Sequence, residues 1–215
     1  QGDTARTTDI VRRLEARRAP PVQVRYLKAR LAMRDAKWAE ATTLLENLRA
    51  EVTHLPGLEI QLNLLLAVCA GKLGDPEAEE KAYQRVAHAD PKNVQARTGL
   101  GNLYLTLGRF DEAVRELEAA AQSPFAPGSV VAQWVRTKAQ RLRAANAPPA
   151  EWARLDQAVV AAAPRFGAVS SEPLVLRAEV AALGGKAAEA VQFLRKEVAR
   201  RPGDARLWAV LADLT

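Results

Sequence analysis

The stretch of sequence that decides the fold is residues 94–127, VQARTGLGNLYLTLGRFDEAVRELEAAAQSPFAP. Apolar residues recur in it at spacings of three and four, which indicates two amphipathic helices. Gly108 lies between the two apolar patterns, and glycine readily adopts the positive φ that ends a helix. Residues 94–127 therefore predict a helix, a tight turn and a second helix.

The composition of the 215-residue chain favours helices throughout. Alanine and leucine dominate its apolar residues, isoleucine occurs only at Ile10 and Ile60, and aromatic residues make up 5%. Alanine and leucine have high helix propensity, whereas isoleucine favours strands, so sandwiches, barrels and α/β sheets are disfavoured. The longest apolar candidate, residues 62–70, has about half of the ~20 residues that a membrane-spanning helix needs.

The motif in residues 94–127 resembles the tetratricopeptide repeat, a ~34-residue helix–turn–helix unit. The resemblance rests on Leu100-Gly101-x2-Tyr104, on Gly108-Arg109-Phe110-Asp111-Glu112-Ala113, and on Leu117 and Ala120. It implies that Gly101 and Ala113 let the two helices approach closely. It also implies that Tyr104 and Phe110 fill the contact between them.

The same frame recurs along most of the chain, and the resemblance implies an all-α fold, a right-handed superhelical solenoid of stacked antiparallel helix pairs. Two departures from the pattern stand out: Glu79 replaces a small residue, and the turn at residues 35–37 lacks glycine. Both ends of the chain are expected to be interior points of a longer protein. The predicted organisation is a partial unit at 1–19, repeats at 22–55, 60–93 and 94–127, an irregular unit at 128–170, a repeat at 171–204 and a partial repeat at 205–215.

Catalytic and metal-binding residues are scarce, so we predict no enzyme activity, no cofactor and no metal site. Cys69 is the only cysteine, and His54 and His88 are the only histidines. Gly184-Gly185-Lys186 lacks the Ser or Thr and the longer glycine-spaced loop of a phosphate-binding loop, so a turn between helices is expected there.

The positive charge is concentrated at the start of the chain. The sequence holds 31 basic and 25 acidic residues, and nine of the basic but only three of the acidic residues lie in positions 1–34. The first 18 residues have no apolar segment typical of a signal peptide. The compartment stays open between the cytoplasm and a bacterial periplasm.

The family resemblance also implies a concave groove, lined by the first helix of each repeat, that receives extended peptides. The partner-binding residues that it implies are Tyr26, Arg30, Arg34, Lys72, Gln95, Thr98, Asn102 and Arg136. Gln140, Arg143, Glu172, Val175, Glu179 and Leu183 are expected to face the same groove. Its first part is expected to be basic and polar, and its end acidic.

These observations predict a non-enzymatic scaffold, of bacterial origin, that binds a protein or peptide segment, with a preference for acidic or polar sequences. One alternative is a substrate-recruiting region of an enzyme whose catalytic domain lies elsewhere. Another is a nucleic-acid-binding helical repeat. It is disfavoured because the groove positions do not repeat one polar residue type from unit to unit. Trp38, Trp134, Trp152 and Trp208 could stack on bases but are expected to pack in the core.

Overall fold

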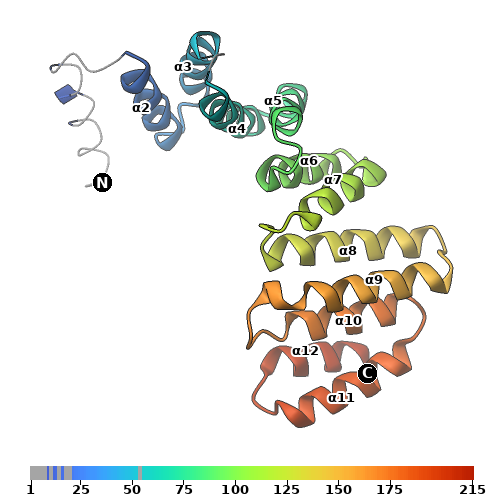
Figure 1. Ribbon diagram of the computed structural model, residues 1–215. Coiled ribbons are helices and arrows are strands. Elements are labelled where there is room, and N and C mark those ends of the chain that lie inside the picture. The colour runs from blue at the N-terminus through green and yellow to red at the C-terminus, as the bar shows by residue number, and fades with distance from the viewer. Residues whose placement is uncertain (1–8, 10–11, 14–15, 17–20, 53–54) are drawn as a thin grey trace. The chain divides into compact units, whose positions relative to one another are not determined.

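The computed structural model is built entirely of helices over the residues that it describes, which are 9, 12–13, 16, 21–52 and 55–215 (Figure 1). The all-α fold class is confirmed. His54 and the inward-facing positions Ile10, Val11 and Leu14 expected for the partial unit at 1–19 lie outside these residues. The chain divides into two compact units, residues 1–103 and 104–215, and each is described by itself.

The first unit consists of consecutive helices that pack against their neighbours in sequence. They are α2 (Pro21–Arg34), α3 (Trp38–Glu51), α4 (Pro56–Leu73), α5 (Pro76–Ala89) and most of α6 (Val94–Thr106), within which the division falls. Contacts join α2 to α3, α3 to α4, and α4 to α5. Leu45, Leu48, Leu62 and Val86 are fully buried between them. Each helix alone would leave an apolar face in water, so its stability comes from this packing.

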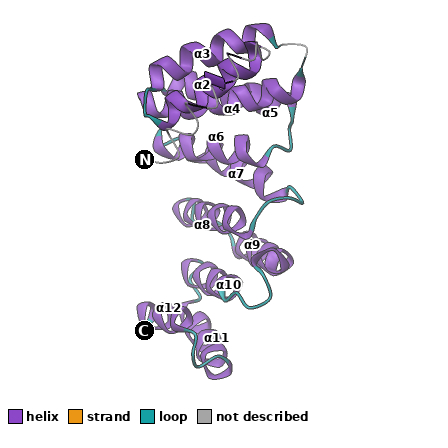
Figure 2. Cartoon of the chain, turned by 90° about the vertical axis from the view of Figure 1, so that its left-hand side faces the viewer, coloured by secondary structure: helices purple, strands orange, loops and turns teal. Residues whose placement is uncertain are grey.

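The second unit continues the same pattern of neighbouring pairs. Its helices are α7 (Phe110–Gln122), α8 (Gly128–Ala144), α9 (Pro149–Ala162), the 3₁₀ turn η1 (Ala163–Phe166), α10 (Glu172–Leu183), α11 (Ala187–Arg200) and α12 (Ala205–Leu214). Leu117, Val131, Leu155 and Leu176 form one core cluster, and Leu194 and Leu207 belong to a second. Figure 2 shows α8, α10 and α12 stacked on one side of this unit, with α9 and α11 on the other.

The expected turns near residues 35, 74, 108 and 184 each lie between two helices. Gly74 and Gly108 both have φ of 72°. At the turn without glycine, Ala36 takes φ of 57° itself. Ala36 therefore occupies the left-handed region that a side chain normally disfavours.

Two expectations about aromatic residues are wrong. Phe110 does not fill the contact inside its helix pair, because it is the first residue of α7 and its side chain is 56% exposed. The Arg109 guanidinium instead covers the buried Tyr104 ring, 4.3 Å from the ring centre. Trp208 is also 49% exposed, and its Nε1–H donates to the Pro202 carbonyl at 3.0 Å. Trp134 is buried as expected.

Candidate functional site

A groove of about 500 Å³ opens along the first helices of the second unit. Positions 136, 140 and 143 of α8 share one helix face, because residues four and seven apart are separated by about one and two turns. The helix α10 packs against both α8 and α12, so side chains of all three helices meet there. The groove is lined by Val135, Arg136, Ala139, Gln140, Arg143, Glu179, Val180, Ala182, Leu183, Ala187 and Leu214.

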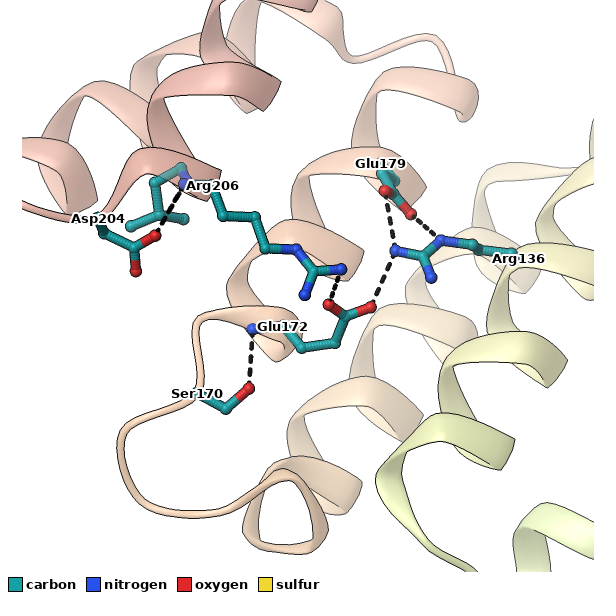
Figure 3. A network of polar contacts seen from close by, with 7 residues as sticks. Arg136, Ser170, Glu172, Glu179, Asp204 and Arg206 are labelled. Atoms are coloured by element: carbon teal, nitrogen blue, oxygen red, sulfur yellow. Dashed lines mark hydrogen bonds and ion pairs between the residues drawn. The ribbon is translucent and has the colours of Figure 1, made fainter. Parts of the chain in front are cut away.

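A network of opposite charges joins α8, α10 and α12 at this groove (Figure 3). Arg136 Nε donates to Glu179 Oε2 at 2.9 Å, and Arg136 Nη2 donates to Glu179 Oε1 at 3.1 Å. The same Nη2 donates to Glu172 Oε1 at 2.9 Å. Arg206, on α12, forms an ion pair with Glu172 Oε2. Arg136 thus binds both Glu179 and Glu172. Glu172 in turn binds both Arg136 and Arg206.

Glu172 is the buried centre of the network, with 8% of the residue exposed. It is the first residue of α10, where a carboxylate interacts favourably with the helix dipole. Burial alone would lower the pKa of Arg136, but the hydrogen bonds and charges of Glu179 and Glu172 raise that pKa above its ordinary value. A buried carboxylate is stable only when it is paired in this way, so the network fixes the spacing of the three helices.

Arg143 and Gln140 differ from Arg136 because both side chains are exposed. Neither side chain has a hydrogen-bond or ion-pair partner within the described part of the chain. Two Arg and two Glu side chains of the network cancel in charge, so Arg143 carries the groove's surplus positive charge. The expectation of an acidic end is therefore wrong: Glu172 and Glu179 are neutralised by cations from neighbouring first helices.

The acid-free basic segment 123–150 is also largely neutralised by neighbouring helices. Lys138 Nζ donates to Glu118 Oε1 of α7 at 3.0 Å. Arg141 Nε donates to Asp111 Oδ1 of α7 at 2.5 Å. Arg136, Lys138 and Arg141 thus each face different acidic partners, and Arg143 is the cation of this segment that has none among the described residues.

The sequence expectation and the structure agree for part of the groove. The structure brings Arg136, Gln140, Arg143, Glu179 and Leu183 together around one groove. Glu172 and Val175, expected to face the groove with them, are instead buried, with 8% and 1% exposed. The contribution of Leu214 and the partner role of Arg206 were not anticipated. Both lie in the last ten residues, where the sequence offered only an incomplete repeat.

The other predicted partner-binding residues lie in the first unit. Tyr26 is half-buried and lines an apolar groove of about 330 Å³ with Val22, Gln23, Leu27 and Leu58. The remaining six occupy α2, α4 and α6. Arg30, Arg34, Lys72, Gln95 and Asn102 are exposed, with Arg34 3.7 Å from Asp35, and Thr98 has a buried hydroxyl.

A second cavity of about 620 Å³ lies among α9, α10 and α11. Trp152 and Phe193 are its half-buried aromatic residues. Its charged lining residues are paired internally: Arg177 Nε donates to Asp156 Oδ1 at 2.8 Å, and Lys186 is paired with Glu189 at 3.2 Å. Its lining therefore carries no net charge.

The described residues offer little for catalysis by a metal. No group of three or more His, Cys, Asp or Glu side chains gathers among them in a way that could hold a metal ion. Cys69 is buried, and burial raises the pKa of its thiol despite a hydrogen bond with Thr42 that lowers it. None of the helices described here combines the length and apolar character needed to cross a membrane.

Comparison with known proteins places the chain among helical repeat proteins. A sequence profile described as the tetratricopeptide repeat matches residues 26–94 and 64–129. No curated protein has a matching sequence. The C-terminal part of a repeat-containing protein from Cytophaga hutchinsonii superposes with a TM-score of 0.73 at 16% identity, covering 99% of this chain and 80% of that one. A repeat protein from Parabacteroides merdae gives 0.67 at 14% identity, with 90% and 72% covered. At these identities the likeness shows the fold.

Proposed function

Because this chain belongs to the tetratricopeptide repeat family, we propose that it is a non-catalytic scaffold that binds an extended segment of another protein in the α8–α10–α12 groove. Tetratricopeptide repeats are generally protein–protein interaction modules, and their fold is typically non-catalytic. The proposal adds the location of the binding surface and the form of the partner.

The observation that carries this proposal is the composition of the groove. It combines an apolar surface, from Leu183 and Leu214, with exposed polar groups on one face of α8. Clefts that bind ligands share this mixture, in which apolar contact supplies affinity and a few polar groups fix orientation. The Arg136–Glu179–Glu172–Arg206 network supports the proposal because it holds the three helices that form the walls.

Within the first unit, considered by itself, exposed side chains on the first helices are proposed as a further partner-binding surface. Arg30 and Arg34 are one helical turn apart on α2, and Lys72 is exposed on α4. We assign Tyr26, Gln95, Thr98 and Asn102 to the same partner-binding role. Cations on neighbouring first helices would strengthen the attraction for an acidic segment, and salt would screen it.

The test is binding of a library of capped nine-residue peptides to the full chain at low and moderate salt. Gln140→Ala combined with Arg143→Glu should weaken the selected peptides about three- to tenfold, because exposed charged contacts are worth about 1 kcal/mol. Arg195→Glu is the matched control, since Arg195 is an exposed residue of α11 outside the groove. Arg30→Glu with Arg34→Glu tests the first unit. Equal binding by wild type and the groove variant would refute the assignment of this groove.

A further inference from the structure

Resting on the proposed function, we infer that the α8–α10–α12 groove selects a segment with one acidic side chain flanked by apolar side chains. Glu179 restricts the groove to a single acidic side chain, because its own carboxylate already binds Arg136. Arg143 is then the residue that recognises the partner's carboxylate. Arg136 is a specificity determinant, because its carboxylate partners are already supplied by the protein.

The requirement for one acidic side chain follows from the charges along the groove. Arg143 is exposed and has no side-chain partner in the described part of the chain, whereas the cations of the network each hold a carboxylate. A partner carboxylate therefore meets one uncompensated guanidinium. A bidentate contact between carboxylate and guanidinium is the strongest hydrogen-bonded arrangement available to such a pair.

The requirement for apolar neighbours follows from the rest of the lining. Besides its charged residues and Gln140, the groove offers a partner an apolar surface made by Ala182, Leu183, Ala187 and Leu214, which are partly or fully exposed. A partner that placed further charges on this surface would lose their hydration without gaining an opposite charge. Small or branched apolar side chains on either side of the acid avoid that cost.

Glu179 limits the number of acidic side chains that the groove accepts, because it competes with a partner's carboxylate for Arg136 from within the same molecule. Its two carboxylate oxygens accept from Arg136 Nε and Nη2 at 2.9 and 3.1 Å. A second acidic residue of the partner would have to displace this carboxylate. Glu179 is held beside Arg136 by α10, so its effective concentration far exceeds that of a dissolved peptide. A second acidic side chain of the partner would therefore lose its hydration without gaining a contact with Arg136.

Three capped peptides of nine residues test this inference by fluorescence anisotropy with the full chain. Each has alanine and serine ends around a centre of Leu-Gln-Leu, Leu-Glu-Leu or Glu-Leu-Glu, and acetyl and amide caps remove the terminal charges. Wild type should bind Leu-Glu-Leu about three- to tenfold more tightly than Leu-Gln-Leu. It should bind Glu-Leu-Glu no more tightly than Leu-Glu-Leu. Arg143→Gln should remove the preference for Glu over Gln.

Glu179→Gln should leave Glu172 as the only carboxylate partner of Arg136 and give the network a net positive charge. It should improve binding of Glu-Leu-Glu about two- to fivefold, with Leu-Glu-Leu changed less. Glu189→Gln is the matched control, because it raises the net charge equally but lies on α11 outside this groove. The double variant Arg136→Gln, Glu179→Gln removes both charges of the pair. It should keep the preference for Leu-Glu-Leu over Leu-Gln-Leu, which separates Arg143 from Arg136 even if the single variant folds poorly.

The outcomes distinguish failure of the proposed function from failure of this inference. If no peptide of the broad library binds the groove, the proposed function is wrong. If peptides bind but Gln and Glu centres are equal, or if Glu179→Gln leaves Glu-Leu-Glu unchanged, this inference is overturned while the proposed function stands. A further control is the Leu-Gln-Leu peptide made without its amide cap, so that its C-terminal carboxylate is the peptide's source of negative charge. Binding that depends on it alone would also overturn the inference.

Discussion

At the scale of single residues, Glu79 shows how one close helix contact is rearranged. Glu79 lies on α5 at a position where the repeat pattern has a small residue. The neighbouring helix α4 has Gly71 opposite it, and the absence of a side chain there leaves room for the Glu79 carboxylate. A Cβ at Gly71 would lie 2.9 Å from Glu79 Oε2. Burial raises the pKa of the Glu79 carboxyl above its ordinary value of 4.5. Burial, and after it the Glu79 charge, also raises the pKa of Tyr83. Glu79 therefore disfavours the folded state when it is ionised.

Glu79→Gln should stabilise the protein at neutral pH by removing this buried charge. Because the pKa of Glu79 is higher in the folded than in the unfolded state, the wild-type penalty is absent below about pH 4.5, grows as pH rises towards the folded pKa, and is complete above it. The gain in melting temperature should thus be larger at pH 7 than at pH 4. Glu77→Gln, at an exposed position on the same helix, is the control, and an equal response of both variants would contradict this account.

Residue-level predictions from sequence succeed where the contact is local and fail where it is distant. The family resemblance implied that Arg136 faces the groove, and Arg136 lines the α8–α10–α12 groove in the structure. Its carboxylate partners are 36 and 43 residues away, and no local pattern pairs them with it. Phe110 failed for a different reason: a repeat motif gives the residue type at a position, but Arg109 is long enough to cover Tyr104 in its place.

At the scale of helices and turns, the turn after α2 has the same backbone geometry as the turn at Gly108, although it contains no glycine. The Lys37 N–H donates to the Ala32 carbonyl at 2.8 Å, as the Arg109 N–H does to the Tyr104 carbonyl at the equivalent turn. Both turns place one residue at positive φ, Ala36 in the first and Gly108 in the second. Turn positions could therefore be predicted from the repeat spacing even where glycine is missing.

Ala36→Gly should stabilise the protein by about 0.5–1 kcal/mol, because a Cβ is unfavourable in the left-handed region. Glycine also adds entropy to the unfolded chain, which keeps the gain below the full steric cost. The matched control is Ala50→Gly, at an exposed position in the last turn of α3, which should lose up to about 0.5 kcal/mol because no positive φ favours glycine there. Urea unfolding of the three proteins measures both changes, and destabilisation by Ala36→Gly would contradict the positive φ.

At the scale of the whole chain, the distribution of charge bears on the class of partner. The net charge is +6, and its surplus arises in positions 1–34. In the second unit, Arg136, Lys138 and Arg141 of the acid-free segment are all held by carboxylates of neighbouring helices. Cations engaged in this way are poor phosphate ligands, because each must first leave an existing partner.

The chain should consequently bind single-stranded RNA only weakly. Anisotropy of a labelled 20-nucleotide RNA should give a dissociation constant of about 10 μM or weaker at 150 mM salt, in the range of non-specific electrostatic binding, and the affinity should fall steeply with salt. Nanomolar binding that persists at moderate salt would favour the nucleic-acid alternative over the scaffold.

The central claim, that the α8–α10–α12 groove receives a partner segment, is tested most directly by mapping a bound peptide on the full chain. Two-dimensional ¹H–¹⁵N spectra recorded during titration with the capped Leu-Glu-Leu peptide should show shifts concentrated in residues 136–143 and 179–183. Residues 149–156 of α9, beside the Trp152–Phe193 cavity, should remain unperturbed. Shifts confined to that cavity, or none in the groove while the peptide is bound, would contradict the claim.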